Sequence, residues 1–187
     1  MHPTLKSLHD RTLGMIERVR DATSGMDQDQ LNEGVENEWS VAQVLEHMRL
    51  THQPYLEAME SAIAMAAPAT NGPVPPHLSW FGKSMVKMSG PGGNAPAPKR
   101  LHPAVGFYGR LVVEDFARDQ RRIANAIQLA SQIDLNKTRF RNPFLPLIKM
   151  RVSDALFVLV EHGERHVRQI EERAAAVKAR TERAATR

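Results

Sequence analysis

The sequence has no cysteine, and aromatic residues make up only 5% of its 187 positions. Without cysteine, neither a disulfide framework nor a thiolate of the protein's own can form, so any thiol chemistry would need a thiol from outside the chain. Long hydrophobic runs are also missing. The longest uncharged apolar run near the centre of a predicted helix covers residues 155–160, which is too short to span a bilayer. The first residues lack the apolar core of a signal peptide, so we expect a cytoplasmic protein with no membrane partner.

Recognition elements for nucleic acid are absent from the sequence as well. The net charge is +4 and the pI is about 9.7, but much of the basic excess lies in residues 173–187, RAAAVKARTERAATR. Zinc-finger spacing, aromatic stacking motifs and phosphate-binding glycine loops do not occur. We therefore expect no nucleic-acid partner. Residues 174–187 are interpreted as a charged, Ala-rich C-terminal tail, either a frayed helix extension or a solvated segment.

Helical periodicity dominates what is present. Apolar residues recur at helical spacing in four long stretches, and no stretch has convincing strand periodicity. The predicted long helices cover residues 4–22, 41–66, 106–133 and 152–172. Phe107 and Leu111 fall on the apolar side of the third of these helices.

The segments between these helices are polar or rich in proline and glycine. We predict a loop with at most a short turn at residues 23–38, a long connection at residues 68–103 with a short helix at 79–88, and another loop at 134–151. The length favours one domain, residues 1–173. Its predicted fold class is all-α: a four-helix bundle with a long crossover connection between the second and third helices.

The last predicted helix carries two histidines on its apolar side. Its stripe, at spacings of four, three, four and four, is Ala155, Leu159, His162, His166 and Ile170. Two inward imidazoles four residues apart can provide two nitrogen ligands to one metal ion. The alternative is that each histidine is a structural residue with a carboxylate or carbonyl partner. The spacing alone leaves both interpretations open.

This pair differs from the zinc helix of metalloproteases. That motif places a glutamate directly after the first histidine, where it acts as general base. Here Gly163 occupies that position, and Glu164 lies on the far side of the helix, where we expect it to face solvent. We exclude a metalloprotease of this kind. Gly163 can instead allow a neighbouring helix or a ligand to come close.

The second predicted helix offers two candidates for a third ligand. It begins at a capping box, in which Ser40 caps the first turn and Gln43 occupies the third helical position. His52 lies near the middle of its apolar stripe, whereas His47 lies on the flank. Periodicity favours His52, but a flanking residue can still face a second neighbouring helix in a bundle. Pro54 is expected to kink or loosen the helix just after His52.

Two short motifs resemble those of a known family. The sequence WSVAQVLEH at residues 39–47, followed by HGERHVRQ at residues 162–169, is similar to the DinB-like superfamily, also described as damage-inducible or YfiT-like metalloenzymes. The resemblance spans roughly residues 4–173. In that family the histidine of the second helix and the pair on the last helix hold a divalent metal. The resemblance therefore implies His47, His162 and His166 as metal ligands, against the preference of periodicity for His52.

The resemblance also implies a range of functions. Characterised branches of the family resemble thiol-dependent transferases and isomerases that use low-molecular-weight thiols such as bacillithiol, mycothiol or glutathione. A three-histidine metal site with an open position could activate a bound thiol or a water molecule, and we expect zinc or nickel. The leading hypothesis is a metal-dependent thiol transferase, isomerase or hydrolase acting on a small electrophile. The alternative is a non-catalytic metal-binding or stress-associated bundle.

No second catalytic group stands out beside the three histidines. The polar residues closest to them in sequence are all interpreted as helix-surface residues: Glu46, Glu161, Arg165 and Gln169. The sequence does not identify the substrate, the thiol or the oligomeric state, for which a homodimer is one option.

Overall fold

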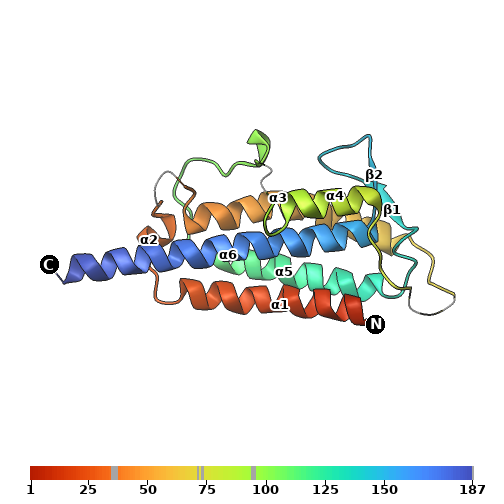
Figure 1. Ribbon diagram of the computed structural model, residues 1–187, viewed down its shortest axis with the longest axis horizontal. Helices are drawn as coiled ribbons and strands as arrows, with labels where there is room; N and C mark the ends of the chain where they lie inside the picture. Colours follow the sequence, from red (N-terminus) through yellow and green to blue (C-terminus); the bar gives the residue numbers. More distant parts are fainter. Residues whose placement is uncertain (35–37, 71, 73, 94–95, 187) are drawn as a thin grey trace.

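The computed structural model describes residues 1–34, 38–70, 72, 74–93 and 96–186. Its helices are α1 (Pro3–Thr23), α2 (Gln28–Asn32), α3 (Val41–Ala64), α4 (Trp80–Ser89), the 3-10 turn η1 (Lys99–Leu101), α5 (Leu111–Ala130) and α6 (Val152–Ala185). Two short strands, β1 (Arg139–Arg141) and β2 (Lys149–Arg151), complete the described elements. The protein is predominantly helical, as predicted (Figure 1). Within the described ranges, none of the helices is both long and apolar enough to cross a membrane.

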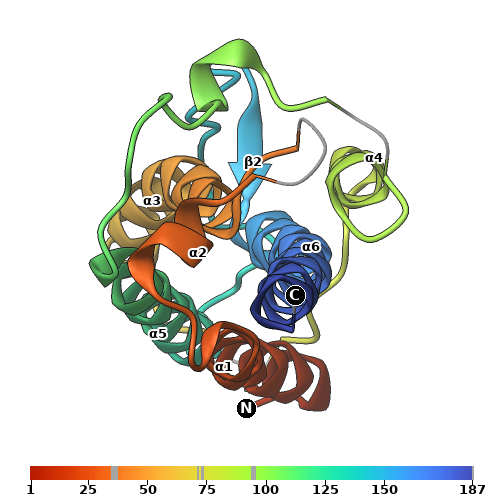
Figure 2. The same cartoon turned by 90° about the vertical axis from the view of Figure 1, so that its left-hand side faces the viewer.

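The four long helices lie side by side. α1 packs against α5 and α6, and α3 packs against the same two helices, so each long helix has at least two neighbours (Figures 1 and 2). Their apolar stripes meet in one core that includes Leu8 and Val19 of α1, Met48 of α3, Ile123 of α5 and Leu159 of α6. Burial of these amphipathic faces is the main favourable contribution to folding.

The start of α3 is determined locally, as the sequence predicts. The side chain of Ser40 accepts a hydrogen bond from the backbone N–H of Gln43, and the Gln43 side chain accepts one from the backbone N–H of Ser40. The same reciprocal arrangement between Asp27 and Gln30 begins α2. The polar segment 23–38 therefore contains one short helix, and residues 35–37 of that predicted loop lie outside the described residues.

Three predictions about the remaining segments need correction. The third long helix begins at Leu111 rather than at residue 106, and Phe107 and Leu111 are 62% and 74% exposed rather than in the core. Residues 134–151 are not entirely loop, because β1 and β2 pair in antiparallel register, with Phe140 opposite Met150. That pair is buried while Arg139 and Arg141 are exposed, an alternation that is too short to recognise as strand periodicity.

The last helix continues far beyond residue 173. α6 extends to Ala185, past the ends of the other long helices (Figure 1). Ala174 and Val177 are buried, so the first turns after residue 173 still contribute to the core. The rest of the predicted tail is largely exposed, and residue 187 lies outside the described part of the chain.

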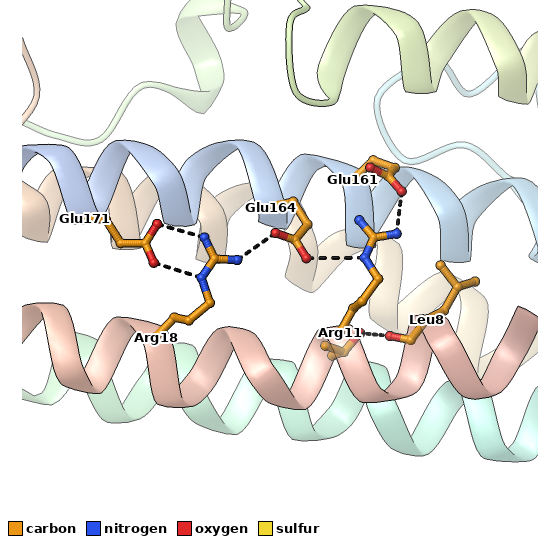
Figure 3. A network of polar contacts seen from close by, with 7 residues as sticks. Leu8, Arg11, Arg18, Glu161, Glu164 and Glu171 are labelled. Atoms are coloured by element: carbon orange, nitrogen blue, oxygen red, sulfur yellow. Dashed lines mark hydrogen bonds and ion pairs between the residues drawn. The ribbon is translucent and has the colours of Figure 1, made fainter.

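Alternating ion pairs join α1 to α6 (Figure 3). Arg11 donates to Glu161 at 2.7 Å and to Glu164 at 3.3 Å. Arg18 donates to Glu164 at 2.7 Å and bonds Glu171 through two nitrogens, at 2.8 and 2.7 Å. The prediction that Glu164 faces solvent is therefore wrong, because α1 covers that side of α6. The Glu164 side chain is only 13% exposed.

A side chain of α1 packs against Gly163. A Cβ atom at this position would lie 2.8 Å from Sδ of Met15, so an alanine here would require the Met15 side chain to shift. Of the two expected neighbours, a helix or a ligand, it is a side chain of the helix α1 that lies there.

The short helix α4 packs against α6 (Figure 2). The carboxylate of Asp154, on α6, accepts hydrogen bonds from the backbone N–H and the hydroxyl of Ser79, at 2.7 and 2.6 Å. Ser79 in turn caps α4 by accepting from the N–H of Gly82. The predicted short helix at 79–88 is therefore present, and it covers one side of the region in which the histidines lie. Residues 71, 73, 94 and 95 of the long connection lie outside the described residues.

Candidate metal centre

Three histidines from two helices meet in the interior. His47 comes from α3, and His162 and His166 come from successive turns of α6. One ring nitrogen of each lies within 4.8 Å of the corresponding nitrogens of the other two. All three side chains are buried, with exposed fractions of 2%, 8% and 5%. The structure thus brings together the three residues that the family resemblance implies.

The outer nitrogen of each ring has a partner. Nδ1 of His47 lies 2.8 Å from the carbonyl oxygen of Leu101, in η1. Nδ1 of His166 lies 2.7 Å from Oε1 of Gln169, one turn further along α6. Because a carbonyl and an amide oxygen only accept, both Nδ1 atoms carry hydrogen and both Nε2 atoms are left with a free lone pair.

His52 is the outer partner of the third ring. Its Nε2 lies 3.0 Å from Nδ1 of His162. When His162 donates from Nδ1, its own Nε2 is free as well, and His52 then carries its hydrogen on Nδ1, which has no partner among the described residues. Both histidines of α3 are therefore part of the cluster: His47 lies with the pair on α6, and His52 orients His162 from behind.

The inward ring nitrogens are better arranged to bind a divalent cation than to form hydrogen bonds with one another. Nε2 of His162 and Nε2 of His166 are 3.1 Å apart, so two lone pairs face each other when both Nδ1 atoms carry hydrogen. Two nitrogens bound to one zinc ion, each at about 2.1 Å, can lie no more than about 4.2 Å apart. The three nitrogens, all within 4.8 Å of one another, are close to that limit. Imidazole nitrogens held by outer hydrogen bonds are the usual donor set for zinc and nickel.

The environment keeps these imidazoles neutral. Burial lowers the pKa of His166 and the pKa of His52 to about 3. Burial lowers the pKa of His47 as well and places the pKa of His162 well below its ordinary value, with the charges of neighbouring imidazoles adding to the effect at His162. Neutral imidazole is the form that binds metal, so the cluster can act as a ligand set at neutral pH.

Aromatic rings and the long connection enclose the site. The ring of Trp39, just before α3, lies 5.0 Å from that of His47, centroid to centroid, and 5.3 Å from that of His102. The WS sequence at residues 39–40 therefore has two structural roles, because it caps α3 and packs on the histidine eight residues later.

A cavity of about 560 Å³ opens onto the three histidines. That size is in the range of small-molecule sites. Its walls come from α3, α4, η1, α6 and the loop between β1 and β2. They are mainly apolar, with a few polar groups. Lining residues include Trp39, Tyr55, Met85, Phe144, Leu159, Arg165, Gln169 and Arg173.

Sequence reasoning missed several residues of this site. Arg165 and Gln169, interpreted as surface residues, line the cavity. Each directly precedes a residue of the histidine stripe in the sequence, so both lie on the same flank of that stripe, a relation that a helical wheel of residues 162–173 would have shown. The carbonyl of Leu101 could not be found from sequence, because it reaches His47 only through the path of the long connection. Glu46 forms an ion pair with Arg49, and Glu161 forms one with Arg11. Neither glutamate lines the cavity.

The other histidines do not join the cluster. His9 lies on α1 beside Asp10, and His77 and His102 are exposed loop residues. His77 faces Arg151, and His102 lies near the carbonyl of Ala97. The expectation that they are not ligands agrees with these positions.

Comparison with known proteins gives one assignment. No curated protein and no solved structure matches the chain. The family model of the DinB superfamily matches residues 11–170, which include the C-terminal part of α1, all four histidines of the cluster and the first half of α6. The chain belongs to the DinB superfamily.

Proposed function

We propose that His47, His162 and His166 bind one divalent metal ion, zinc or nickel, and that the protein is a metal-dependent enzyme acting on a small molecule in the adjoining cavity. Its reaction is an S-transfer or isomerisation that uses a low-molecular-weight thiol. In this proposal α1, α3, α5 and α6 form the four-helix bundle of the superfamily, with residues 68–103 as the crossover. The protein acts in the cytoplasm.

One observation carries the proposal: one ring nitrogen from each of three buried histidines converges with the other two, while Nδ1 of each ring lies against an outer partner, on Leu101, His52 or Gln169. Three buried imidazoles with inward lone pairs are costly without a cation, because polar atoms taken from water need partners. The outer hydrogen bonds fix the ring orientation and increase the basicity of the inward nitrogen, as in known metal sites.

A bound ion supplies a Lewis acid that lowers the pKa of a thiol or a water molecule bound beside it. Because the chain has no cysteine, the thiol must enter as a cosubstrate. The protein's own residues hold the imidazoles neutral and oriented. The apolar wall formed by residues such as Trp39, Phe144 and Leu159 excludes water from the bound substrate.

The test has two readouts on the same protein. Metal content is measured by mass spectrometry after purification and dialysis, for the wild type, His162→Ala and His9→Ala. We expect about one ion per chain in the wild type and in His9→Ala, and loss of the ion in His162→Ala. His9 is the matched control because it is a histidine of α1 outside the cluster.

Activity is then followed with a panel of small thiols and 1-chloro-2,4-dinitrobenzene as the chromogenic electrophile. We expect conjugate formation above the uncatalysed rate with at least one thiol, in the metal-loaded wild type and in His9→Ala only. Hydrolysis without thiol is measured in parallel. If metal binds but no turnover occurs, the alternative function, a non-catalytic metal-binding bundle, becomes the better description. If no metal binds to the wild type, the metal-dependent enzyme and the metal-binding bundle both fail, and only a metal-free, stress-associated bundle is left.

A further inference from the structure

A second polar stripe runs along α6 beside the histidines. Arg165, Gln169 and Arg173 follow one another at intervals of four residues, and all three line the cavity. Four residues of helix turn the chain by about 400°, so these side chains project from the same side, and the first and last are about 12 Å apart along the axis. The stripe extends the site from the metal centre toward Glu38.

The arginines of this cavity are incompletely paired. Arg165 has no hydrogen-bond or ion-pair partner among the residues the structure describes. Arg173 bonds Glu38 at 3.2 Å, but its Nη1 is buried and has no partner in the described part of the chain. Arg100 is held by the carbonyl of Phe144 at 2.6 Å and lies over the ring of the same residue.

The charge of the cavity is therefore positive. Among its described lining residues, three arginines face one carboxylate, that of Glu38, and the histidines are neutral. Two positive charges remain uncompensated before any metal ion is counted. Positively charged clefts with apolar walls attract and retain anions, because the field is screened less there than at an open surface.

We infer that the cavity binds an anionic small molecule whose carboxylate or phosphate group is held by Arg165, with Arg173 as a second anchor further along the stripe. This inference rests on the proposed function, because it names the class of ligand for the same site. The planar guanidinium fork matches both anions. The apolar wall opposite, which includes Trp39 and Phe144, takes the rest of the ligand. A molecule with an anionic group at one end and an apolar body fits both halves.

The test uses three probes of similar shape: 4-phenylbutyrate, its neutral amide 4-phenylbutyramide, and 3-phenylpropylphosphonate. Binding is measured by isothermal titration calorimetry with the wild type, Arg165→Gln, Arg173→Gln and Arg168→Gln. Arg168 is the matched control, because it is an exposed arginine of the same helix that does not line the cavity. All three substitutions remove one positive charge, and thermal melts verify that each variant folds.

We expect at least one anionic probe to bind the wild type about tenfold more tightly than the amide, since charge-assisted hydrogen bonds are stronger than neutral ones. The preference should be lost in Arg165→Gln, reduced in Arg173→Gln and kept in Arg168→Gln. Which anion binds better identifies the group. Equal binding of acid and amide, no binding of either anion, or an unchanged preference in Arg165→Gln would overturn the inference.

Repeating the titration after chelation separates this inference from the proposed metal. A preference that survives in chelated protein and depends on Arg165 supports the anion site even when no metal is found in the wild type. A preference that disappears on chelation but persists in metal-loaded Arg165→Gln shows that the ion, not the arginine, holds the anion. In that case the anion site fails and the metal centre stands.

Discussion

The two charged sides of α6 differ in how completely their charges are paired. Toward α1 the helix presents Glu161, Glu164 and Glu171, and Arg11 and Arg18 meet all three (Figure 3). Toward the cavity it presents Arg165 and Arg173, and the described residues there contribute only one carboxylate, that of Glu38. The charges on the α1 side are thus paired within the protein, whereas part of the positive charge on the cavity side is not.

The pairing on the α1 side has no need of anything outside the protein. Its carboxylates and guanidinium groups bond one another across a helix contact, and they fix how the two helices lie. The cavity side is different. The inward nitrogens of the three histidines and Nη1 of Arg173 have hydrogen-bonding capacity that the described residues do not fill. Departures from complete pairing of buried polar groups tend to occur at functional sites. The predictions below test this contrast.

The largest expected effect is loss of metal binding, which should follow a substitution on the cavity side of α6 but not one on the α1 side. His166→Ala should contain no bound ion and should show no rise of Tm on addition of zinc, whereas Glu164→Gln should retain both. An ion that binds only the folded state stabilises it by about 2.7 kcal/mol at a free concentration 100 times Kd. Metal analysis and thermal melts with and without zinc provide the measurement. A zinc-dependent rise of Tm in His166→Ala as large as that of the wild type would show that zinc stabilises the protein at a site that does not need His166.

The second prediction concerns acid. The histidines of the cluster have lowered pKa values in the folded protein, about 3 for His52 and His166, against about 6.5 in an unfolded chain. Below pH 6.5 the unfolded state therefore binds more protons, so the stabilising contribution is complete above pH 6.5 and is lost as the pH falls from 6.5 toward 3. Each such histidine lowers the free energy of unfolding by up to about 1.4 kcal/mol per pH unit in that window.

The measurement is urea denaturation at pH 7.5, 6.5 and 5.5, with chelator present so that metal release does not contribute. His166→Ala should flatten the dependence by the contribution of one histidine, and His9→Ala should not. A wild-type free energy of unfolding that stays constant or increases between pH 6.5 and 5.5 would contradict the lowered pKa values. With metal present the loss should be steeper, because protons then also displace the ion.

The third prediction tests the role of His52 behind His162. His52→Leu should lower metal affinity about 10–100-fold, the usual effect of removing an outer partner of a metal-binding histidine. Stability of the metal-free protein should change little. The substitution leaves Nδ1 of His162 without its acceptor, but it also removes the Nδ1 of His52, which has no partner among the described residues.

Competition with a zinc-binding dye gives the affinities, and His52→Gln, whose amide oxygen can still accept from His162, is the matched control. It should recover part of the lost affinity. Complete loss of metal in His52→Leu together with full retention in His47→Ala would instead make His52 the ligand and His47 the outer residue.

The features of the fold that depend on local sequence patterns could be predicted. The capping box at Ser40 and the apolar stripe of α6 placed both helices, and the stripe turned His162 and His166 inward. The α1 stripe is likewise buried as predicted. Choosing His47 as the ligand required the family motif, because the wheel of α3 alone ranks His52 higher. The structure shows why: both histidines are buried and both lie against the ring of His162, but only His47 also lies against the ring of His166.

Features that depend on which helix lies beside which could not be predicted. Glu164 is covered because α1 packs on that side of α6, and a single-helix wheel contains no such information. Arg165 lines a cavity only because the long connection and the β1–β2 loop close over α6. The strands themselves have three residues each, too few for a period of two to stand out. Tertiary neighbours, rather than local preference, decided these cases.

The smallest expected effect lies on the paired side. Glu164→Gln keeps the volume but removes the charge that Arg11 and Arg18 share. Both arginines are about a third exposed, at 35% and 36%, so solvent screens the pairs and we expect a loss of about 1 kcal/mol in the free energy of unfolding. Glu172→Gln, at an exposed position of the same helix with no ion pair among the described residues, should change it by less than about 0.5 kcal/mol. Urea denaturation at 0.05 and 0.5 M sodium chloride measures both, and the difference should shrink at high salt. Equal stability of the two variants at low salt would mean that the α1 side, despite its completed pairs, contributes no more than an open surface does.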